Sequence, residues 1–317
     1  MKALVTGAAG FIGSNLATAL SDDGVEVVGL DCFTDFYARD IKERNVAVLR
    51  SRPNFRLIEG ALQTADLAEA LDGVTHVFHL AAQAGVRSSW GSEFTTYTSH
   101  NVDGTQRLLE AVKDRPLTRF VYASSSSVYG DAAAIPMTED ARVQPVSPYG
   151  VTKLAAEHLC YLYHVNYGVP AVSLRYFTVF GPGQRPDMGF HRFLKAAHSG
   201  QPISLYGDGE QTRDFTFVAD AVAATRAAGD RGRPGAVYNI GGGSRISIRE
   251  VLAIIERLAG RPLVINRGPA QKGDMRDTFA DTSRARQDLG FTPTYSVESG
   301  LAAESDWIAG LLRRSTS

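Results

Sequence analysis

The chain has 317 residues, of which 44% are hydrophobic, so it can bury a large core and is long enough for two domains. Its 33 Lys and Arg residues nearly balance its 34 Asp and Glu residues, and neither charge forms long runs. Proteins that bind nucleic acid through its phosphates carry a basic surplus, so no nucleic-acid partner is expected.

The two cysteines, Cys32 and Cys160, lie far apart and lack the spacing of a metal site. We interpret them as reduced thiols of an intracellular protein. After Met1 and Lys2 the sequence enters an apolar strand without a signal-type stretch, and no apolar run reaches membrane-spanning length. We therefore expect a cytoplasmic protein with no metal and no membrane partner.

The first elements predict a unit that binds a dinucleotide. A short buried strand over residues 2–5 leads through the turn Gly7-x-x-Gly10-x-x-Gly13 into a helix, and a second strand ends just before Asp31. Glycines let the backbone approach a pyrophosphate, which then meets the free N–H groups of the helix N-terminus. The acid can accept hydrogen bonds from ribose hydroxyls and repels a 2′-phosphate, which favours NAD over NADP.

Strands and helices keep alternating through the first half, which predicts a parallel sheet with helices on both faces. Ligands of such sheets bind beyond the carboxyl ends of the strands, and the fifth strand runs into the serines of residues 124–127. Serines also favour plain loops, but this position indicates a binding role. The expected strands are residues 2–5, 25–30, 55–59, 75–80, 120–123 and 171–177. A first helix is expected to end near residue 20, and two more are expected over residues 64–71 and 101–113.

A helix over residues 148–167 is predicted because Ser147 is a good N-cap and Pro148 suits the first helical position. Residues four apart share a helix face, so the Tyr149 phenol and the Lys153 ammonium should lie together. A nearby cation lowers the pKa of a phenol from its reference value of about 10, and the pair can then take a proton from a hydroxyl group. A surface Tyr and Lys at helical spacing would look the same, so the other motifs must support this interpretation.

These motifs resemble those of the extended short-chain dehydrogenase/reductases that act on nucleotide sugars. The resemblance covers residues 2 to about 311 and implies an α/β fold with a Rossmann-type doubly wound parallel sheet and a smaller mixed α/β substrate-binding domain. It also implies that Ser125, Tyr149 and Lys153 form the catalytic set. NAD would contact Gly7, Gly10, Phe11, Ile12, Gly13, Asp31, Ala61, Leu62, Leu80, Ala81, Ala82, Asn101, Tyr149 and Lys153.

One departure from the family concerns the adenine end of the NAD site. Relatives often carry an acidic residue after the third strand, where this sequence has Ala61-Leu62, so backbone contacts are expected there instead. Beyond the sixth strand the elements become shorter and richer in Gly and Pro, as in an inserted substrate lobe. We assign residues 1–177 and 214–242 to the NAD-binding domain, and residues 178–213 and 243–317 to the nucleotide-sugar-binding domain.

The resemblance also suggests how the nucleotide sugar is held. Residues 207–215 resemble the family segment whose arginine, here Arg213, contacts the nucleotide diphosphate, and Arg276 matches a second such arginine. The planar guanidinium suits this role because it pairs with phosphate oxygens. The UDP-sugar would contact Arg87, Ser125, Ser126, Ser127, Tyr149, Thr178, Arg185, Gln211, Arg213 and Arg276.

Several positions resemble the glucuronate-epimerase subgroup of the family. Related decarboxylases and 4,6-dehydratases carry Glu in place of Ser127, dehydratases carry Asp in place of Ser126, and galactose epimerases carry Asn in place of Thr178. Arg185, in the segment that follows, is expected to pair with a sugar carboxylate. The resemblance thus implies NAD-dependent 4-epimerisation of UDP-glucuronate to UDP-galacturonate through a transient 4-keto intermediate.

Other functions stay open at this point. Within the family, the chain could be a neutral UDP-hexose 4-epimerase or a UDP-glucuronate decarboxylase. A non-catalytic NAD-sensing regulator on the same scaffold belongs to another class. Such regulators commonly lose the catalytic Tyr or Lys, and both Tyr149 and Lys153 are present here.

A homodimer is also expected. In relatives, the helices that correspond to residues 101–113 and 148–167 pair with their symmetry mates in a four-helix contact. The same apolar stripes could instead face the sheet, so the pattern alone does not decide between the two. The stripes consist of Val102, Leu108, Leu109 and Val112 on the first helix, and of Leu154, Ala155, Leu159, Leu162 and Tyr163 on the second.

Overall fold

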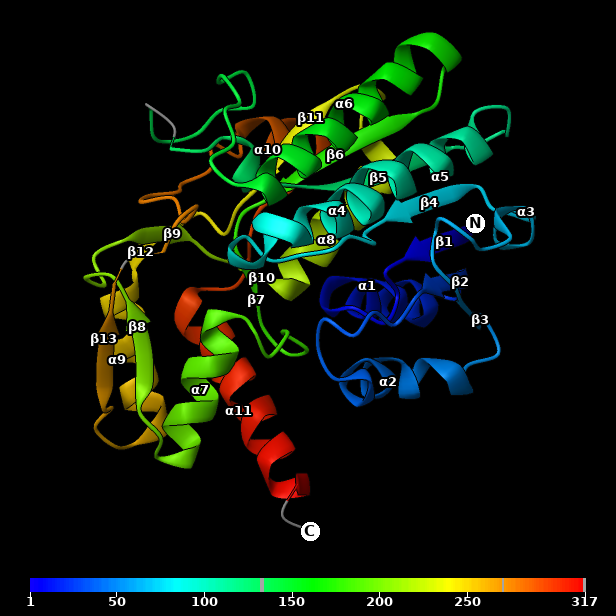
Figure 1. The fold of residues 1–317 in the computed structure, drawn as a ribbon. Helices are drawn as coiled ribbons and strands as arrows, with labels where there is room; N and C mark the ends of the chain where they lie inside the picture. Colours follow the sequence, from blue (N-terminus) through cyan, green and yellow to red (C-terminus); the bar gives the residue numbers. More distant parts are fainter. Residues whose placement is uncertain (132–133, 270, 316–317) are drawn as a thin grey trace.

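A seven-stranded parallel sheet forms the centre of the protein (Figure 1). The computed structural model describes residues 1–131, 134–269 and 271–315. The first six strands stand in the order 3-2-1-4-5-6 that is typical of doubly wound dinucleotide-binding sheets, and a seventh joins the edge beside the sixth. The α/β class and the doubly wound parallel sheet are thereby confirmed. Across the sheet the strands are β3 (Phe55–Glu59), β2 (Glu26–Asp31), β1 (Lys2–Thr6), β4 (His76–His79), β5 (Arg119–Ser125), β6 (Ala171–Tyr176) and β11 (Val237–Ile240).

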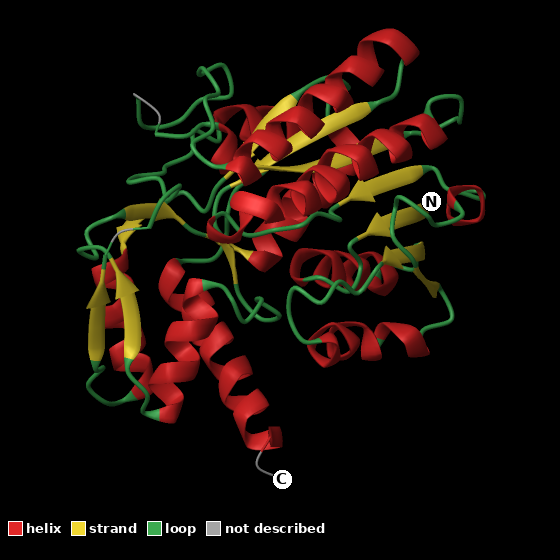
Figure 2. Cartoon of the chain, viewed as in Figure 1, coloured by secondary structure: helices red, strands yellow, loops and turns green. Residues whose placement is uncertain are grey.

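Helices cover both faces of this sheet, as Figure 2 shows. On one face α1 (Phe11–Asp22) packs against α8 (Val218–Arg231), and on the other α5 (Gly104–Val112) packs against α6 (Pro148–Tyr167). Strands covered on both faces are buried along their whole length, as β4 and β6 are, so their sequences show little alternation. Shorter helices beside these layers are α2 (Arg39–Ala47), α3 (Leu67–Ala70) and α4 (Phe94–Thr98).

A second lobe lies beside the sheet (Figure 1). Its strands β8 (Ile203–Tyr206) and β13 (Ile265–Gly268) pair in parallel, while α7 (Gly189–Ser199), α9 (Ile248–Ala259) and α11 (Val297–Ser315) pack against one another. The remaining short elements are β7 (Val179–Phe180), β9 (Thr212–Asp214), β10 (Thr216–Phe217), β12 (Arg245–Ser247), α10 (Ser283–Leu289) and the 3-10 turns Leu49–Ser51, Arg87–Ser89, Gly91–Glu93 and Ser126–Val128.

One apolar core joins the sheet to the second lobe. Val5 and Val121 on the α1 face of the sheet belong to the same buried cluster as Leu205, Ile255 and Leu301 of the lobe. In addition, α10 packs against α8 and β11, so part of the C-terminal third lies against the sheet layer. The two lobes therefore share a packed boundary, and the space for ligands lies where their loops meet.

The helix predicted over residues 148–167 has those bounds in the structure. The Ser147 hydroxyl accepts the Gly150 N–H at 3.1 Å, and Pro148 occupies the first turn. Gly168 ends the helix in the left-handed region with a φ of 71°, where a side chain would be strained. All three signals are local, which explains why the sequence alone located both helix ends.

Several other elements differ from their predicted bounds, most by one or two residues, and three of them have a clear local cause. The helix expected over residues 64–71 is the single turn α3, because the Asp66 carboxylate caps it by accepting the N–H groups of Ala68 and Glu69. The helix expected from residue 101 begins earlier, as α4, and passes through a π-helical turn at Ser99–Asp103 before α5. The fifth strand extends to Ser125, because its two serines continue the pairing with β6.

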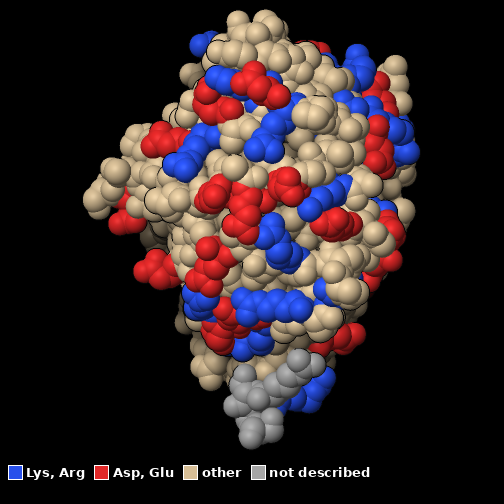
Figure 3. Space-filling model, turned by 90° about the vertical axis from the view of Figure 1, so that its right-hand side faces the viewer, with Lys and Arg blue, Asp and Glu red and all other residues tan. Residues whose placement is uncertain are grey.

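Acidic and basic side chains intermix on the face shown in Figure 3, which agrees with the net charge of −1. Neither sign forms a continuous patch on that face. Among the residues that the structure describes, no helix has the length and apolar character needed to cross a membrane.

Candidate active site

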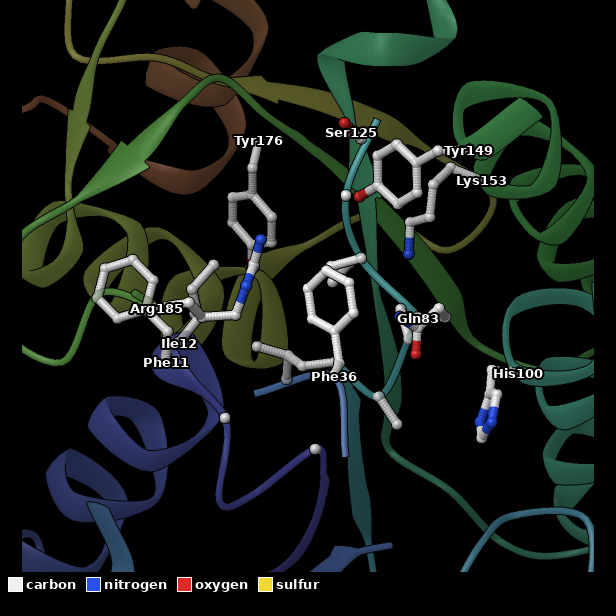
Figure 4. A pocket seen from close by; sticks show the side chains of 18 of the residues that line it. Phe11, Ile12, Phe36, Gln83, His100, Ser125, Tyr149, Lys153, Tyr176 and Arg185 are labelled. Carbon is white, nitrogen blue, oxygen red and sulfur yellow. The ribbon is translucent and has the colours of Figure 1, made fainter. Parts of the chain in front are cut away.

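A pocket of about 410 Å³ lies at the carboxyl ends of the sheet strands, between the two lobes (Figure 4). The ends of β1, β2, β4, β5 and β6 all contribute to its wall, as the fold class predicts. Most of the predicted site residues line it. These are Gly7, Gly10, Phe11, Ile12, Gly13, Asp31, Leu62, Leu80, Ala81, Ala82, Ser125, Ser126, Ser127, Tyr149, Lys153, Thr178, Arg185 and Arg213.

The glycine turn forms a close-packed cradle whose neighbouring backbone leaves no room for side chains. Gly7 has a φ of 71°, and a Cβ there would lie 2.9 Å from the Ala81 amide nitrogen. A Cβ on Gly13 would lie 2.0 Å from the Gly7 carbonyl oxygen. Gly10 is the N-cap residue of α1 and has no side chain to accept a hydrogen bond. The N–H groups of the first helical turn therefore have no side-chain cap. This geometry fits the pyrophosphate of a dinucleotide.

Asp31 lies at the end of β2 and is buried, as its predicted role requires. Its two oxygens accept the N–H groups of Ala9, at 2.9 Å, and Phe33, at 2.8 Å. These bonds fix the carboxylate in place, and its remaining lone pairs can still accept ribose hydroxyls. The Lys42 ammonium, held by the carbonyl and hydroxyl oxygens of Thr34 at 2.6 and 2.9 Å, also lines this end of the pocket.

The predicted catalytic residues meet at the other end of the pocket (Figure 4). Ser125 ends β5, while Tyr149 and Lys153 project from the first turns of α6. Burial raises the pKa of Tyr149, whereas its hydrogen bond with Ser125 and the positive charge of Arg185 act to lower it. Burial also lowers the pKa of Lys153 to about 7, and its ammonium lies 4.5 Å from the centre of the Tyr122 ring.

We expected Lys153 to be the cation that acts on the Tyr149 phenol. In the structure the positive charge of Arg185, from the loop after β7, also acts on that phenol, and the role of Lys153 stays a prediction. The sequence could not reveal this, because helical spacing gives the shared face of α6 but not which side chain a distant loop brings opposite. The second cation increases the electrostatic support available to a phenolate.

The two pocket arginines have different partners. The Nε and Nη2 atoms of Arg185 each lie 3.0 Å from the Asp187 carboxylate. Arg213 instead donates to the backbone carbonyls of Thr212, at 2.8 Å, and Arg276, at 2.9 Å, and burial lowers its pKa. Carbonyls orient a guanidinium without removing its charge, and the carboxylates of Asp274, Asp277 and Asp131 also act on it. A positive charge held in this way suits an anionic group such as a diphosphate.

Five predicted residues do not line the pocket, and their roles stay predictions. Asn101 is buried behind the pocket wall. Its side-chain amide accepts the Gln83 N–H and donates to the Gln83 carbonyl and the Thr152 hydroxyl. It therefore supports a segment that does line the pocket. Arg276 is 62% exposed and pairs with Asp208 at 3.0 Å. The others are Arg87, which pairs with Asp274 at 2.6 Å, Gln211, which donates to the Tyr206 carbonyl, and Ala61.

Other pocket residues were not predicted from the sequence. Phe36 and Tyr37 follow β2, and Met188 follows Arg185, so each lies in a segment already singled out by a strand end or a motif. That position is the signal that could have identified them. His100 and Lys42 carry no such signal, since they reach the pocket from the π-helical turn and from α2.

The chain is similar to known proteins over most of its length. The model of the NAD dependent epimerase/dehydratase family matches residues 3–241. A Bacillus subtilis (strain 168) protein described as an uncharacterized UDP-glucose epimerase, YtcB, is 44% identical over 315 residues, which cover 98% of this chain and 99% of that protein. A UDP-glucuronate 4-epimerase of Thermodesulfobacterium geofontis (strain OPF15) is 38% identical over 313 residues, which cover 96% of this chain and 95% of that protein.

A solved structure is similar over the whole fold. The UDP-glucuronic acid 4-epimerase of Bacillus cereus, in complex with UDP-glucuronic acid and NAD, superimposes with a TM-score of 0.95. It is 44% identical, and the match covers 98% of this chain and 100% of that one. With the glycine cradle, the buried Asp31 and the Ser125–Tyr149–Lys153 set in one pocket, these matches show that the chain belongs to the NAD dependent epimerase/dehydratase family.

Proposed function

We propose that the protein is a UDP-glucuronate 4-epimerase, which converts UDP-glucuronate to UDP-galacturonate through a transient 4-keto sugar. The observation that carries the proposal is the meeting of an acid–base group, Tyr149 with Ser125, and a cation for a carboxylate, Arg185, in one pocket. The similar Bacillus cereus enzyme, which binds UDP-glucuronic acid and NAD, supports it.

The glycine turn and Asp31 are the residues that would hold NAD. The chemistry that bound NAD supplies is reversible hydride transfer at carbon 4 of the sugar. Tyr149 takes the proton of the 4-hydroxyl and later returns it to the ketone oxygen, and Ser125 hydrogen-bonds that oxygen. Lys153 and Arg185 stabilise the phenolate, whose pKa burial would otherwise keep high.

Between the two half-reactions the keto sugar must turn while its diphosphate stays bound. Arg213 suits this anchoring role, because backbone carbonyls fix the orientation of its guanidinium at the pocket wall. The intermediate is a β-keto acid, which loses carbon dioxide when the carboxylate bond stands perpendicular to the carbonyl plane. A clamp of Thr178, Arg185 and the serines would hold that bond near the plane and suppress the loss.

The test is to incubate the purified protein separately with UDP-glucuronate and UDP-glucose and to separate the products. We expect UDP-galacturonate from the first, at a higher kcat/KM than any epimerisation of the second, with little carbon dioxide. Stoichiometric carbon dioxide would instead identify a decarboxylase. Turnover of the neutral sugar alone would identify a UDP-hexose epimerase, and the absence of turnover with either sugar, despite NAD binding, would favour a regulator.

We also propose that the two lobes divide the ligand between them. Residues 1–177 and 214–242 bind NAD, and residues 178–213 and 243–317 bind the nucleotide sugar. The glycine turn and Asp31 lie in the first set, whereas Thr178, Arg185 and Arg213 lie in the second, which supports this division.

We further propose that the protein is cytoplasmic. Both cysteines are free thiols, as suits a reducing compartment.

We also propose that it is a homodimer. Several residues of the two apolar helix stripes, Leu108, Leu109, Val112 and Tyr163, are buried within the protomer, so they belong to the core. However, α6 leaves other large apolar side chains exposed: Val151 by 48%, Leu162 by 50% and Val165 by 60%. Such a row on one helix favours a protein–protein contact.

Light scattering at micromolar concentration tests the dimer. The wild type should have twice the mass of one chain, and Leu162→Arg should shift it toward the mass of a single chain because a charge would be buried in the contact. Val264→Arg, at a 59% exposed residue outside α6, is the matched control and should leave the mass unchanged. A wild-type protein with the mass of one chain would reject the proposal.

A further inference from the structure

A buried ion pair lies beneath the catalytic end of the pocket. The Glu157 carboxylate accepts two hydrogen bonds from the Arg175 guanidinium, at 2.6 and 3.1 Å, and one from the Ser124 hydroxyl, at 2.6 Å. Arg175 also donates to the Tyr129 hydroxyl at 2.9 Å. Glu157 and Arg175 are each 4% exposed. These contacts place both charges in the interior with their main hydrogen bonds satisfied.

The members of this cluster stand beside the site residues on three separate elements. Glu157 lies on α6, one turn beyond Lys153 and two turns beyond Tyr149, so it shares their face of the helix. Ser124 directly precedes Ser125 in β5. Arg175 lies in β6, which leads into Thr178 and the substrate loop. A single carboxylate therefore ties together the three elements that carry the site.

We propose that Glu157 is a positioning residue for the reaction: through Ser124 and Arg175 it fixes α6 against the ends of β5 and β6, so that Tyr149 stays beside Ser125. The inference rests on the proposed function, because it assigns Glu157 a role in that epimerisation. Glu157 touches neither the sugar nor the cofactor in this scheme. It acts through the placement of Tyr149.

A purely stabilising role explains the pair less well. Removing two charges from water costs about as much as their attraction returns, so a buried ion pair adds little net stability compared with apolar side chains. What an ion pair adds is a fixed relative orientation of the two side chains, because a planar guanidinium and a carboxylate are joined by two parallel hydrogen bonds. Proton transfer between Tyr149 and a bound hydroxyl depends steeply on such placement, and a shift of about 1 Å can lower a rate about a hundredfold.

The test replaces both charges together, Glu157→Leu with Arg175→Met, so that no unpaired charge is left inside the protein. We expect a folded protein that binds NAD and UDP-glucuronate as the wild type does, with KM within about threefold and kcat lowered about tenfold to a hundredfold. A folded double variant with unchanged kcat would overturn the proposal.

A matched control separates placement from stability. Asp220 is also buried and accepts three hydrogen bonds, from Thr294 and Tyr295, but it lies outside the pocket lining. Asp220→Asn should lower the melting temperature and leave kcat of the folded fraction unchanged. An equal loss of kcat in both variants would mean that general destabilisation is the cause, and would also overturn the proposal.

If the double variant does not fold, Ser124→Ala decides the question. This change leaves the ion pair intact and removes the link from Glu157 to β5, so kcat should still fall. Because Ser124 also lines the pocket, KM is the second readout: it should hold, whereas loss of a direct ligand contact would raise it. Unchanged kcat, or a raised KM, counts against the proposal. A wild type that turns over only a neutral UDP-sugar contradicts the proposed substrate. The same comparison of kcat on that sugar nevertheless tests Glu157.

Discussion

The guanidinium of Arg185 forms two hydrogen bonds of 3.0 Å with Asp187, so a carboxylate already occupies its forked edge. An acidic sugar would either share this cation or displace Asp187 from it. Because the charge of this cation opposes the rise in the pKa of Tyr149 that burial causes, its placement links recognition of the substrate to activation of the base. A neutral sugar offers no charge to this arrangement.

Replacing Arg185 by alanine should therefore discriminate between substrates. A buried charge-assisted hydrogen bond contributes roughly 1.5–3 kcal/mol, so kcat/KM for UDP-glucuronate should fall about tenfold to a hundredfold. Binding of UDP-glucose, measured by calorimetry, should change little, and some decarboxylated pentose product should appear as the clamp loosens. Equal losses of binding for the acidic and the neutral sugar nucleotide would contradict the carboxylate assignment.

The Tyr149 hydroxyl is the proposed base, and Tyr149→Phe removes it without changing the ring. Turnover should be abolished, while NAD and UDP-glucuronate still bind with affinities close to those of the wild type. Tyr37→Phe removes a hydroxyl from another tyrosine of the same pocket and serves as the control. Residual turnover in Tyr149→Phe equal to that of the control would eliminate Tyr149 as the base.

At the scale of elements, the C-terminal helix α11 anchors the substrate loop. Its residue Glu304 is buried, and one carboxyl oxygen accepts the Gly181 N–H at 2.8 Å. Gly181 lies in the loop that carries Arg185, so a helix from the end of the chain fixes a segment of the pocket wall. The other carboxyl oxygen is buried without a hydrogen-bond partner among the described residues. Burial raises the pKa of Glu304 to about 8.

This pKa predicts a pH dependence of stability. Between the ordinary value of 4.5 and about 8, the folded state keeps the Glu304 proton and the unfolded state does not. The free energy of unfolding should therefore fall as pH rises through this range, and Glu304→Gln should flatten that slope. Glu298→Gln, at an exposed residue of the same helix that pairs with Arg257, is the control. Urea unfolding at several pH values measures the effect, and an unchanged slope in Glu304→Gln would contradict it.

The sequence predicted those elements and site residues whose signals are local. The bounds of α6 follow from Ser147, Pro148 and Gly168, and the glycine turn with Asp31 located the proposed NAD site. The π-helical turn before α5 was missed, because the hydrogen bonds of its Asn101 join it to a segment about 18 residues earlier and to α6. Pocket residues from α2 were missed for the same reason: only the folded chain brings them to the strand ends.

At the scale of the whole molecule, the central sheet is completed by a segment, α8 and β11, that comes after residues 178–213 of the substrate lobe. Helix α8 covers β4, β5 and β6 and packs against α1, although residues 178–213 separate it from β6. A fragment of residues 1–177 lacks this cover and exposes the apolar α1 face, with Val5 and Val121 among its buried members.

Residues 1–242 should therefore be more soluble and bind NAD more tightly than residues 1–177. Expression of both fragments, followed by measurement of the soluble fraction and of NAD affinity, tests this expectation. Equal solubility and affinity would show that α8 and β11 are dispensable for the NAD site.

Because β11 is synthesised well after β6, the sheet stays incomplete for some time during translation. Sixty residues lie between the end of β6 at Tyr176 and the start of β11 at Val237. At about 5–20 residues per second, a ribosome needs roughly 3 to 12 s to make them. During that interval the outer edge of β6 presents unpaired backbone groups, which a neighbouring nascent chain can bind. Slow translation between these strands therefore lengthens the period in which two chains can join by the wrong edge.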